Sequence, residues 1–426
     1  MAQLQEGIYH RPGRRPGRCF AILFLRARST DARAVGECFG RLWEMYQGLK
    51  RGEVRDLPGH PVEPSDLTVL VGIGPNAFRL QGMARPRPAG VSDRALFLPP
   101  KAEGGGPLLR GAGLSYAEDV RENPATEELV VQAIADSELA VKRVVVETWK
   151  LLHDTADPQT GAAPLEPRTF YLGFQRDDRR SWIDFHDGVS NLRSDQREGV
   201  IVIAPTNIAD EEWTFGGTYL AFLRLQVDLR AWRALDRREQ ELLVGRDKLT
   251  GCPLVALADD GTPVALEGCP IGGEPISATA NDPIAEPPPV SDERLAESHI
   301  QRANHHVTPP EDPSTRRVFR QGYEFLEWSP SAPGFRAGLN FVSFQDTSLR
   351  LLSMLTQPGW LGGTNFGGDP ENQPEALRRL LEVYAAGVYL VPPRQDGELF
   401  PGAQAFGLEA AEPTASETRP QPISAA

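Results

Sequence analysis

The chain of 426 residues contains no run of about 18 apolar residues, so the sequence predicts no membrane-spanning helix and no membrane partner. Its first residues also lack a basic stretch followed by an apolar one, which is the order typical of a secretory signal. We therefore expect a protein that is neither inserted into a membrane nor secreted.

Cysteine is scarce: the chain has four, at Cys19, Cys38, Cys252 and Cys269. None of them forms a CxxC or CxxCH motif, which argues against a zinc ribbon, a thioredoxin-type site and a covalently attached c-type haem. The expected compartment is the reducing cytoplasm.

Basic residues are outnumbered by acidic ones, 45 to 58, which gives a formal net charge of −13. Proteins that bind nucleic acid typically carry a basic surface, so we expect no nucleic-acid partner. Apolar residues make up 40% of the chain and can form a sizeable core, whereas 38 prolines and 41 glycines predict long loops.

A strand-like segment followed by a polar N-cap and a helical apolar period occurs three times, at residues 20–27, 218–226 and 338–345. A further strand is expected over residues 67–73. Helices are expected over residues 133–152 and over residues 236–244, where Asp236 and Glu239 fit a capping box. Because the pattern falls in two sets about 200 residues apart, we predict two copies of one α+β unit, each with helices on an antiparallel sheet.

The composition changes twice along the second half of the chain. Residues 251–292 are rich in glycine and proline and predict a long connection. Residues 403–426, rich in Ala, Glu, Pro and Thr, predict a disordered tail. The expected domains are residues 1–211 and residues 212–402.

The first candidate functional segment contains Asp187 and Gly188, next to His186. An Asp-Gly step among aromatic residues is typical of a tight turn. The alternative is a carboxylate held where the backbone approaches a ligand, an approach that Gly188 permits. We expect His186, as the adjacent residue, to point elsewhere.

The second candidate segment holds three of the seven histidines, His299, His305 and His306. This spacing fits a solvent-exposed polar loop, a metal site built from the three imidazoles, or one axial ligand for a haem iron. No nearby cysteine or HExxH motif supports a structural zinc site. A third segment places Arg320 before Gly322 and Tyr323, which alone indicates a surface turn.

Taken in order, these segments resemble the dye-decolorizing (DyP-type) peroxidases, from about residue 20 to about residue 402. The family's GxxDG loop is similar to residues 184–188, and its H-I-R-x-x-N segment is similar to residues 299–304. Its R-x-G-Y arginine matches Arg320, and its Gly-Leu-x-Phe strand matches residues 338–341. Residues 244–254 also resemble the family, and we expect them to be structural only.

The resemblance implies an α+β fold of two ferredoxin-like domains, of the dimeric α+β barrel type. It also implies a peroxidase that binds haem b non-covalently, reduces hydrogen peroxide, and oxidises dyes or phenolic donors in one-electron steps. In such an enzyme, Asp187 would be the catalytic acid and base, Arg320 would stabilise negative charge, and His299 would be the iron ligand. The other expected cofactor-binding residues are Leu339, Phe341, Gly188, Asn191 and Arg302.

The chain departs from the family pattern at two positions. Asp184 replaces the first glycine of GxxDG, so its carboxylate either points to solvent or raises the pKa of Asp187 by repulsion. Gln301 replaces the usual arginine. In some family members, a carboxylate of the last domain hydrogen-bonds the histidine that binds iron. In this chain no acid stands in register near residues 353–354, and Asp346 is the substitute that we consider.

Two other hypotheses remain open. The chain could carry haem or another hydrophobic ligand without turnover, or it could bind a non-haem metal through the three histidines. The sequence leaves undecided the physiological electron donor, the residues that transfer radicals and the oligomeric state, a homo-oligomer included. It also leaves open a targeting role for the C-terminal tail.

Overall fold

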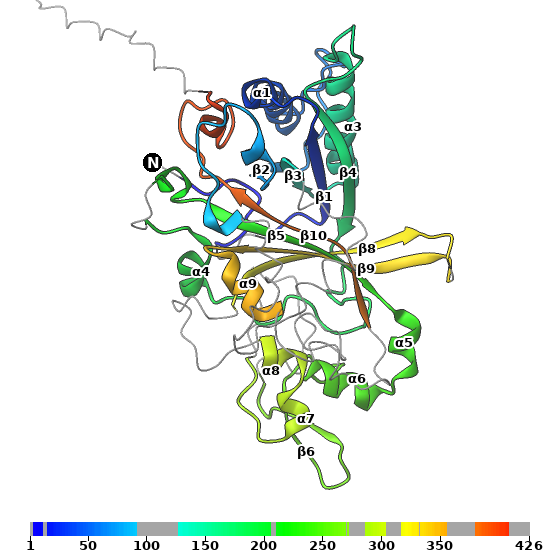
Figure 1. The fold of residues 1–426 in the computed structure, drawn as a ribbon. Helices are drawn as coiled ribbons and strands as arrows, with labels where there is room; N and C mark the ends of the chain where they lie inside the picture. Colours follow the sequence, from blue (N-terminus) through cyan, green and yellow to red (C-terminus); the bar gives the residue numbers. More distant parts are fainter. Residues whose placement is uncertain are drawn as a thin grey trace, which may run out of the picture.

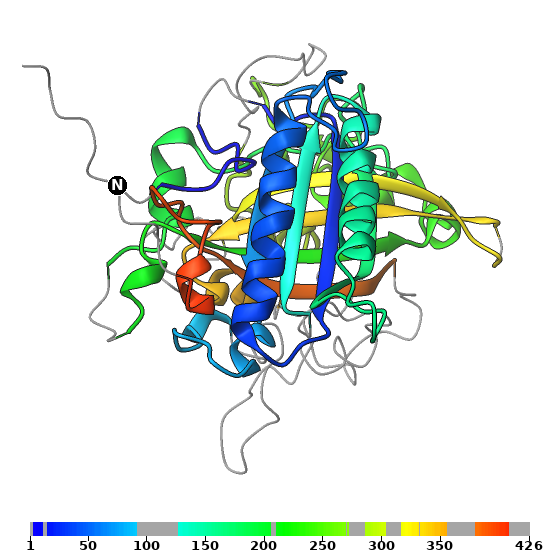
Figure 2. The same ribbon diagram turned by 90° about the horizontal axis from the view of Figure 1, so that it is seen from above.

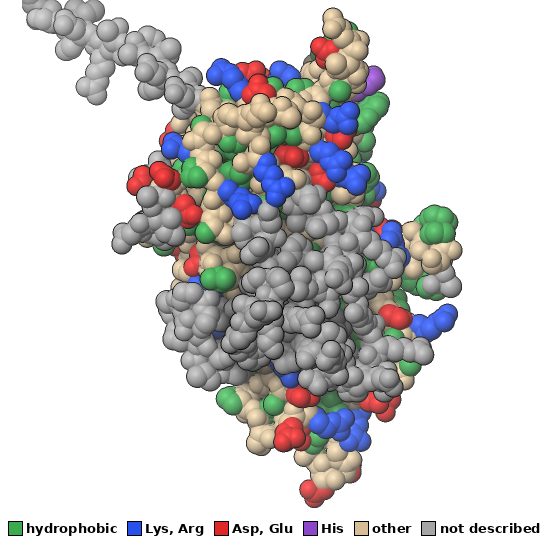
Figure 3. All heavy atoms as spheres, in the orientation of Figure 1, with side chains coloured by type: hydrophobic (Ala, Val, Ile, Leu, Met, Phe, Trp, Pro, Cys, Tyr) green, Lys and Arg blue, Asp and Glu red, His purple; other side chains and the backbone are tan. Residues whose placement is uncertain are grey.

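The computed structural model describes residues 3–11, 15–91, 127–205, 210–269, 271, 286–303, 317–331, 333–355 and 380–408. Eight antiparallel strands form a closed barrel in the order β1-β3-β2-β10-β5-β9-β8-β4 (Figure 1). Acidic and basic side chains are interspersed over the described surface shown in Figure 3.

The N-terminal half of the barrel contributes four strands in the order β4-β1-β3-β2. Two helices, α1 and α3, lie side by side across the outer face of these strands (Figure 2). The elements are β1 (Cys19–Ala27), α1 (Ala32–Lys50), β2 (Thr68–Ile73), β3 (Leu129–Ala135), α3 (Glu138–Asp154) and β4 (Leu165–Phe174).

The C-terminal half repeats this order as β10-β5-β9-β8. In both halves the first strand lies between the third and the fourth, and the second is at the edge, which is the ferredoxin-like arrangement. The halves join through the pairs Ile73–Leu390 and Phe174–Glu324. The elements are β5 (Thr218–Val227), β8 (Phe319–Trp328), β9 (Phe335–Gln345), α9 (Ser348–Leu355) and β10 (Leu381–Val391).

Smaller elements fill the connections, and most of them lie between β5 and β8. Those between β5 and β8 are α5 (Leu229–Ala234), α6 (Arg237–Val244), β6 (Leu254–Leu257), β7 (Pro263–Ala265), α7 (Glu293–Ala296) and α8 (His299–Ala303). The others are η1 (Ala77–Arg79), η2 (Ala89–Val91), α4 (Ser194–Ile201), η4 (Glu212–Thr214) and η7 (Ala403–Phe406).

The structure of β1 explains why its sequence is apolar from Cys19 to Leu25. Phe20 and Phe24 point into the barrel, where they pack on Tyr323 and Phe222. The alternate residues, such as Leu23, belong to the core that packs against the helices. A strand buried on both faces has no polar side, so it appears as a continuous apolar run.

The two-copy α+β prediction is confirmed, and so are the capping box at Asp236 and Glu239 and the four predicted strands. The helix predicted over residues 133–152 is partly wrong. Residues 133–135 belong to β3, and the helix begins at Glu138, where the Ser137 side chain accepts a hydrogen bond from the backbone N–H of Leu139. The domain boundary after residue 211 falls just before η4 and stays a prediction.

The predicted disordered tail starts too early. Phe406 is fully buried, and its ring lies 5.8 Å from that of Phe400. Gly36 of α1 allows the approach, because a Cβ atom there would come within 2.7 Å of Phe406 Cβ. Residues 403–408 are therefore part of the N-terminal core, and residues 409–426 lie outside the described part.

Replacing Phe406 with alanine should lower the free energy of unfolding by about 3–5 kcal/mol, as expected for a large aromatic side chain lost from a core. Urea denaturation measures the change. Leu57→Ala, at a side chain that is 42% exposed, is the control and should change stability by less than about 0.5 kcal/mol. Equal effects of the two substitutions would show that residues 403–408 do not contribute to the core.

Cys252 and Cys269 form a disulfide, whereas Cys19 and Cys38 are buried free thiols. Disulfides are rare in cytosolic proteins, so this bond is at odds with the reducing compartment expected from the sequence. Among the residues that the structure describes, no helix has both the length and the apolar character needed to cross a membrane.

Candidate active site

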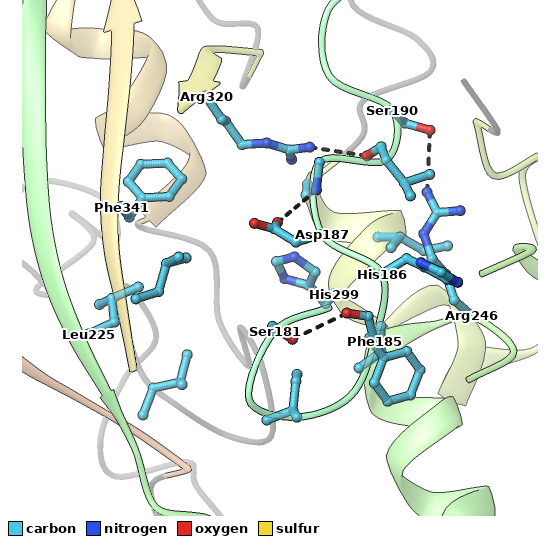
Figure 4. Close-up of a pocket in the computed structure, with 18 of the residues that line it drawn as sticks. Ser181, Phe185, His186, Asp187, Ser190, Leu225, Arg246, His299, Arg320 and Phe341 are labelled. Atoms are coloured by element: carbon cyan, nitrogen blue, oxygen red, sulfur yellow. Dashed lines mark hydrogen bonds between the residues drawn. The ribbon is translucent and has the colours of Figure 1, made fainter. Parts of the chain in front are cut away.

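A cavity of about 250 Å³ lies between the outer face of the C-terminal half of the barrel, the loop after β4, and α8. Asp187, His299, Arg320, Leu339 and Phe341 all line it. Figure 4 shows the Asp187, His299 and Arg320 side chains in the same space, opposite Phe341. The structure therefore brings Asp187 together with residues of α8, β8 and β9 that follow it by more than a hundred positions in the sequence.

The loop after β4 holds Asp187 in a tight turn. The backbone N–H of Asp187 donates to the Arg179 carbonyl oxygen at 2.9 Å, and the N–H of Gly188 donates to Asp187 Oδ1 at 2.8 Å. Gly188 has φ +74°, a conformation that glycine adopts at low cost. Gly188 also lines the cavity, so this segment is both a turn and part of the pocket wall.

Asp184, which stands where the family has glycine, also adopts a left-handed backbone conformation, with φ +66°. Aspartate tolerates this conformation better than most residues, which explains how the loop keeps its shape. The Asp184 carboxylate is 62% exposed and lies 3.7 Å from Lys248 Nζ. Of the two arrangements considered from the sequence, the exposed one is the one observed.

Arg320 lies on β8, where its Nη2 donates to the Val189 carbonyl oxygen at 3.1 Å. Asn191 fixes the Arg320 backbone on both sides: its Nδ2 donates to the Arg320 carbonyl oxygen at 2.9 Å, and its Oδ1 accepts from the Arg320 N–H at 3.2 Å. Asn191 was expected at the cofactor, but it does not line the large cavity. It positions the arginine instead.

His299 is the first residue of α8. Burial, assisted by the nearby Arg320 and Arg246 guanidinium groups, lowers the pKa of its imidazole to about 4. The ring is therefore neutral at pH 7, which is the state that binds a metal. Gly245 makes the start of α8 possible, because a Cβ atom there would come within 2.4 Å of Ser298 Oγ.

Two residues that follow His299 on α8, Gln301 and Arg302, hydrogen-bond backbone carbonyl groups of neighbouring segments. Arg302 Nε donates to the Glu297 carbonyl oxygen at 3.1 Å, and Arg302 does not line the cavity, contrary to the expectation that it contacts a cofactor. Gln301 Nε2 donates to the Pro288 carbonyl oxygen at 2.7 Å. The glutamine that replaces the family's arginine thus ties α8 to the preceding segment.

His186 and Asp346 also have partners of their own. His186 Nε2 lies 2.9 Å from Arg180 Nη2, so its ring is directed to that guanidinium rather than to Asp187, as expected. Asp346 accepts from Arg350 at 2.6 and 3.1 Å and does not line the cavity, so the structure offers no support for Asp346 as a partner of His299.

The three-histidine site falls outside the described chain, because His305 and His306 are not among the described residues. Within the described ranges, no group of three His, Cys, Asp or Glu residues could hold a metal ion.

Sequence reasoning missed several polar residues of the cavity wall, among them Arg246, Arg317 and Glu324. Arg246 is buried, and its guanidinium donates to the Gly251 carbonyl oxygen at 2.8 Å and to Ser190 Oγ at 3.3 Å. Burial, followed by repulsion from Arg320, lowers its pKa to about 10. Residues 244–254, expected to be structural only, therefore also contribute to the site.

Residues 178–396 match the family model described as "Dyp-type peroxidase, C-terminal". The chain is 27% identical to the dye-decolorizing peroxidase of Thermobifida fusca over 347 residues, and 22% identical to the deferrochelatase of Escherichia coli K12 over 291 residues. These alignments cover 78% and 67% of this chain, but only 66% and 59% of the two relatives. The chain thus spans less than two thirds of the length of these relatives.

Solved structures of similar fold include the DyP-type peroxidase from Cellulomonas bogoriensis, with a TM-score of 0.62, 22% identity, and coverage of 92% of this chain and 94% of that one. Ferric DtpA from Streptomyces lividans has a TM-score of 0.63 at 18% identity and covers 95% and 98% of the two chains. At these identities the likeness shows the fold.

Proposed function

Because the chain belongs to the DyP-type peroxidase family, we propose that it is a haem peroxidase that reduces hydrogen peroxide and oxidises dyes or phenolic donors in one-electron steps. The observation that carries the proposal is that Asp187, Arg320 and His299 line one cavity. A carboxylate, a guanidinium and a neutral imidazole are the groups that this chemistry requires from the protein.

The residues of the cavity suit haem b. The neutral His299 imidazole is a nitrogen ligand for iron. Leu223, Leu225 and Phe341 supply apolar wall for the porphyrin, and the guanidinium groups of Arg246 and Arg317 are suited to its propionates. When bound, haem supplies the redox chemistry that breaks the peroxide O–O bond and accepts electrons from the donors.

In this function, Asp187 moves a proton between the two oxygen atoms of hydrogen peroxide. Its carboxylate takes the proton from one oxygen and delivers it to the other, which departs as water. Arg320 presents its guanidinium to the same space, where it stabilises negative charge on the departing oxygen. Leu339 and Phe341 exclude bulk water, which strengthens both interactions.

The proposed partners are hydrogen peroxide and an aromatic or dye donor. Assembly into a homo-oligomer and a cytoplasmic location stay predictions. Sedimentation tests the first, and cell fractionation tests the second.

The function is tested by loading the purified chain with haem and measuring peroxide-dependent oxidation of a phenol and of an anthraquinone dye. We expect many turnovers per haem. Stoichiometric haem binding followed by bleaching, without repeated turnover, would instead support the carrier hypothesis. A chain that binds no haem would contradict both hypotheses.

A further inference from the structure

The outward face of β8 carries residues at three alternate positions, 320, 322 and 324. Side chains of a strand alternate between its faces, and Phe319 and Tyr323 point into the barrel core. Arg320, Gly322 and Glu324 therefore share the opposite face, and both Arg320 and Glu324 line the cavity.

The Asp187 carboxylate lies over Gly322, in the row formed by residues 320, 322 and 324 on the outward face of β8. A Cβ atom at Gly322 would lie 3.3 Å from Asp187 Oδ2, so the absence of a side chain at residue 322 leaves room for that carboxylate. Positions two apart on a strand are about 6.6 Å apart. The Asp187 carboxylate thus lies over the middle of the row, with the guanidinium of Arg320 towards one end and the carboxyl group of Glu324 towards the other.

Glu324 is buried, with only 5% of its surface exposed, and its Oε1 has no hydrogen-bond partner among the described residues. The groups that face it are Asp187, Asp178, Arg176 and the backbone N–H of Trp182. Burial first, and then the charge of Asp187, raise its pKa to about 9, although Arg176 opposes this shift. Glu324 is therefore a neutral carboxylic acid at pH 7, and it can donate a proton.

A second cavity, of about 110 Å³, adjoins the first, and Asp187, Arg320 and Glu324 line both. Its other lining residues include polar side chains such as Gln175, Arg179 and Gln321. Water in a polar cavity of this size can carry protons to a carboxyl group on the shared wall.

We propose that Glu324 is the proton donor to Asp187. Glu324 is a positioning residue, because it acts through the catalytic carboxylate of Asp187. This inference rests on the peroxidase function proposed above. Reduction of one hydrogen peroxide to two water molecules takes up two electrons, from two one-electron donors, and two protons. The two protons of the peroxide itself leave with the first oxygen atom as water, so the two protons taken up go to the second oxygen atom as the donors reduce it. Once the Asp187 carboxylate is free again, Glu324 passes a proton to it, and Asp187 passes that proton to the second oxygen atom, which leaves as water after two such transfers. Glu324 then regains a proton from the second cavity.

The protonation of Glu324 is tested without any turnover, by thermal unfolding of the chain at several pH values. A folded-state pKa above the unfolded value means that the folded chain keeps a proton that the unfolded chain loses, so stability falls as pH rises from 4.5 to about 9. Glu324→Gln removes this contribution. The Tm of the variant relative to wild type should therefore increase with pH across that window.

The matched control is Glu138→Gln, at a side chain that is 68% exposed on α3. Its Tm difference from wild type should not grow with pH in this window. If the Tm difference between Glu324→Gln and wild type is also independent of pH, the proposal is overturned.

The coupling to Asp187 is tested by peroxide-dependent turnover of the haem-loaded protein. Glu324→Gln should slow turnover by about 10²-fold, the lower end of what a positioned proton transfer contributes, and Glu324→Asp should restore part of the rate. The double variant Asp187→Asn/Glu324→Gln should be no slower than Asp187→Asn alone, because Glu324 acts through Asp187.

The outcomes separate the two proposals. Wild-type protein that binds haem but does not turn over peroxide would overturn the proposed function, and this inference with it. If the wild-type protein turns over peroxide and Glu324→Gln does not slow it, only the role of Glu324 is overturned. The same holds if the rate losses of the two single variants multiply in the double variant.

Discussion

Replacing Asp187 with asparagine is expected to slow the reaction of the haem-loaded protein with hydrogen peroxide by about 10²–10⁴-fold, the usual contribution of a positioned acid–base group. The amide has nearly the shape of the carboxylate but cannot take up the peroxide proton. Haem binding should stay unchanged, because His299 and the apolar wall are intact. Stopped-flow absorbance after mixing with peroxide measures the rate.

Asp184→Asn is the matched control for this experiment. Asp184 lies in the same loop, three residues before Asp187, but its exposed carboxylate faces Lys248. The control should react at the wild-type rate. If Asp184→Asn is slowed and Asp187→Asn is not, the catalytic role belongs to the other carboxylate of the loop.

Replacing Arg320 with glutamine is expected to slow the same reaction by about 10²–10³-fold, or about 2.7–4 kcal/mol of transition-state stabilisation. The loss follows from removing a preorganised positive charge beside the departing oxygen. The side-chain amide of Asn191 holds the backbone N–H and carbonyl groups of residue 320, so the strand should keep its position in the variant. Arg320→Lys, which keeps the charge, should retain part of the rate.

Arg302→Gln provides the comparison for this variant. The sequence placed Arg302 at the cofactor, whereas the structure pairs it with Glu297 and leaves it out of the cavity wall. Arg302→Gln should therefore react normally with peroxide. If Arg302→Gln slows the reaction as much as Arg320→Gln does, then lining the cavity does not distinguish the catalytic arginine from other arginines.

The elements that the sequence predicts well are those whose signals are local. The apolar run of β1 and the N-cap and buried stripe of α1 need no knowledge of the rest of the chain. Strand β8 was missed for the opposite reason. Gln321 stands between Phe319 and Tyr323 on its inward-facing side, where it hydrogen-bonds the backbone of Gly7 and Tyr9, so the strand lacks the apolar alternation that identifies a half-buried strand.

The residues of the candidate site also divide into those with a local sequence signal and those without one. Asp187, His299 and Arg320 lie in short motifs, so the resemblance named them one by one, and the structure places all three around one cavity. Glu324 and Arg246 acquire their surroundings only from the fold, through the seam between β4 and β8 and through the turn that follows α6. Their burial and their pKa shifts depend on contacts between segments that are distant in the sequence.

We propose that His299 binds haem iron in the cavity that it shares with Asp187 and Arg320. The most direct measurement is a haem titration followed by absorption spectroscopy, on wild type and on His299→Ala, with His153→Ala on α3 as the control. We expect a histidine-ligated ferric spectrum for wild type and control, and weak binding or an altered spectrum for His299→Ala. An unchanged spectrum and unchanged affinity in His299→Ala would contradict it.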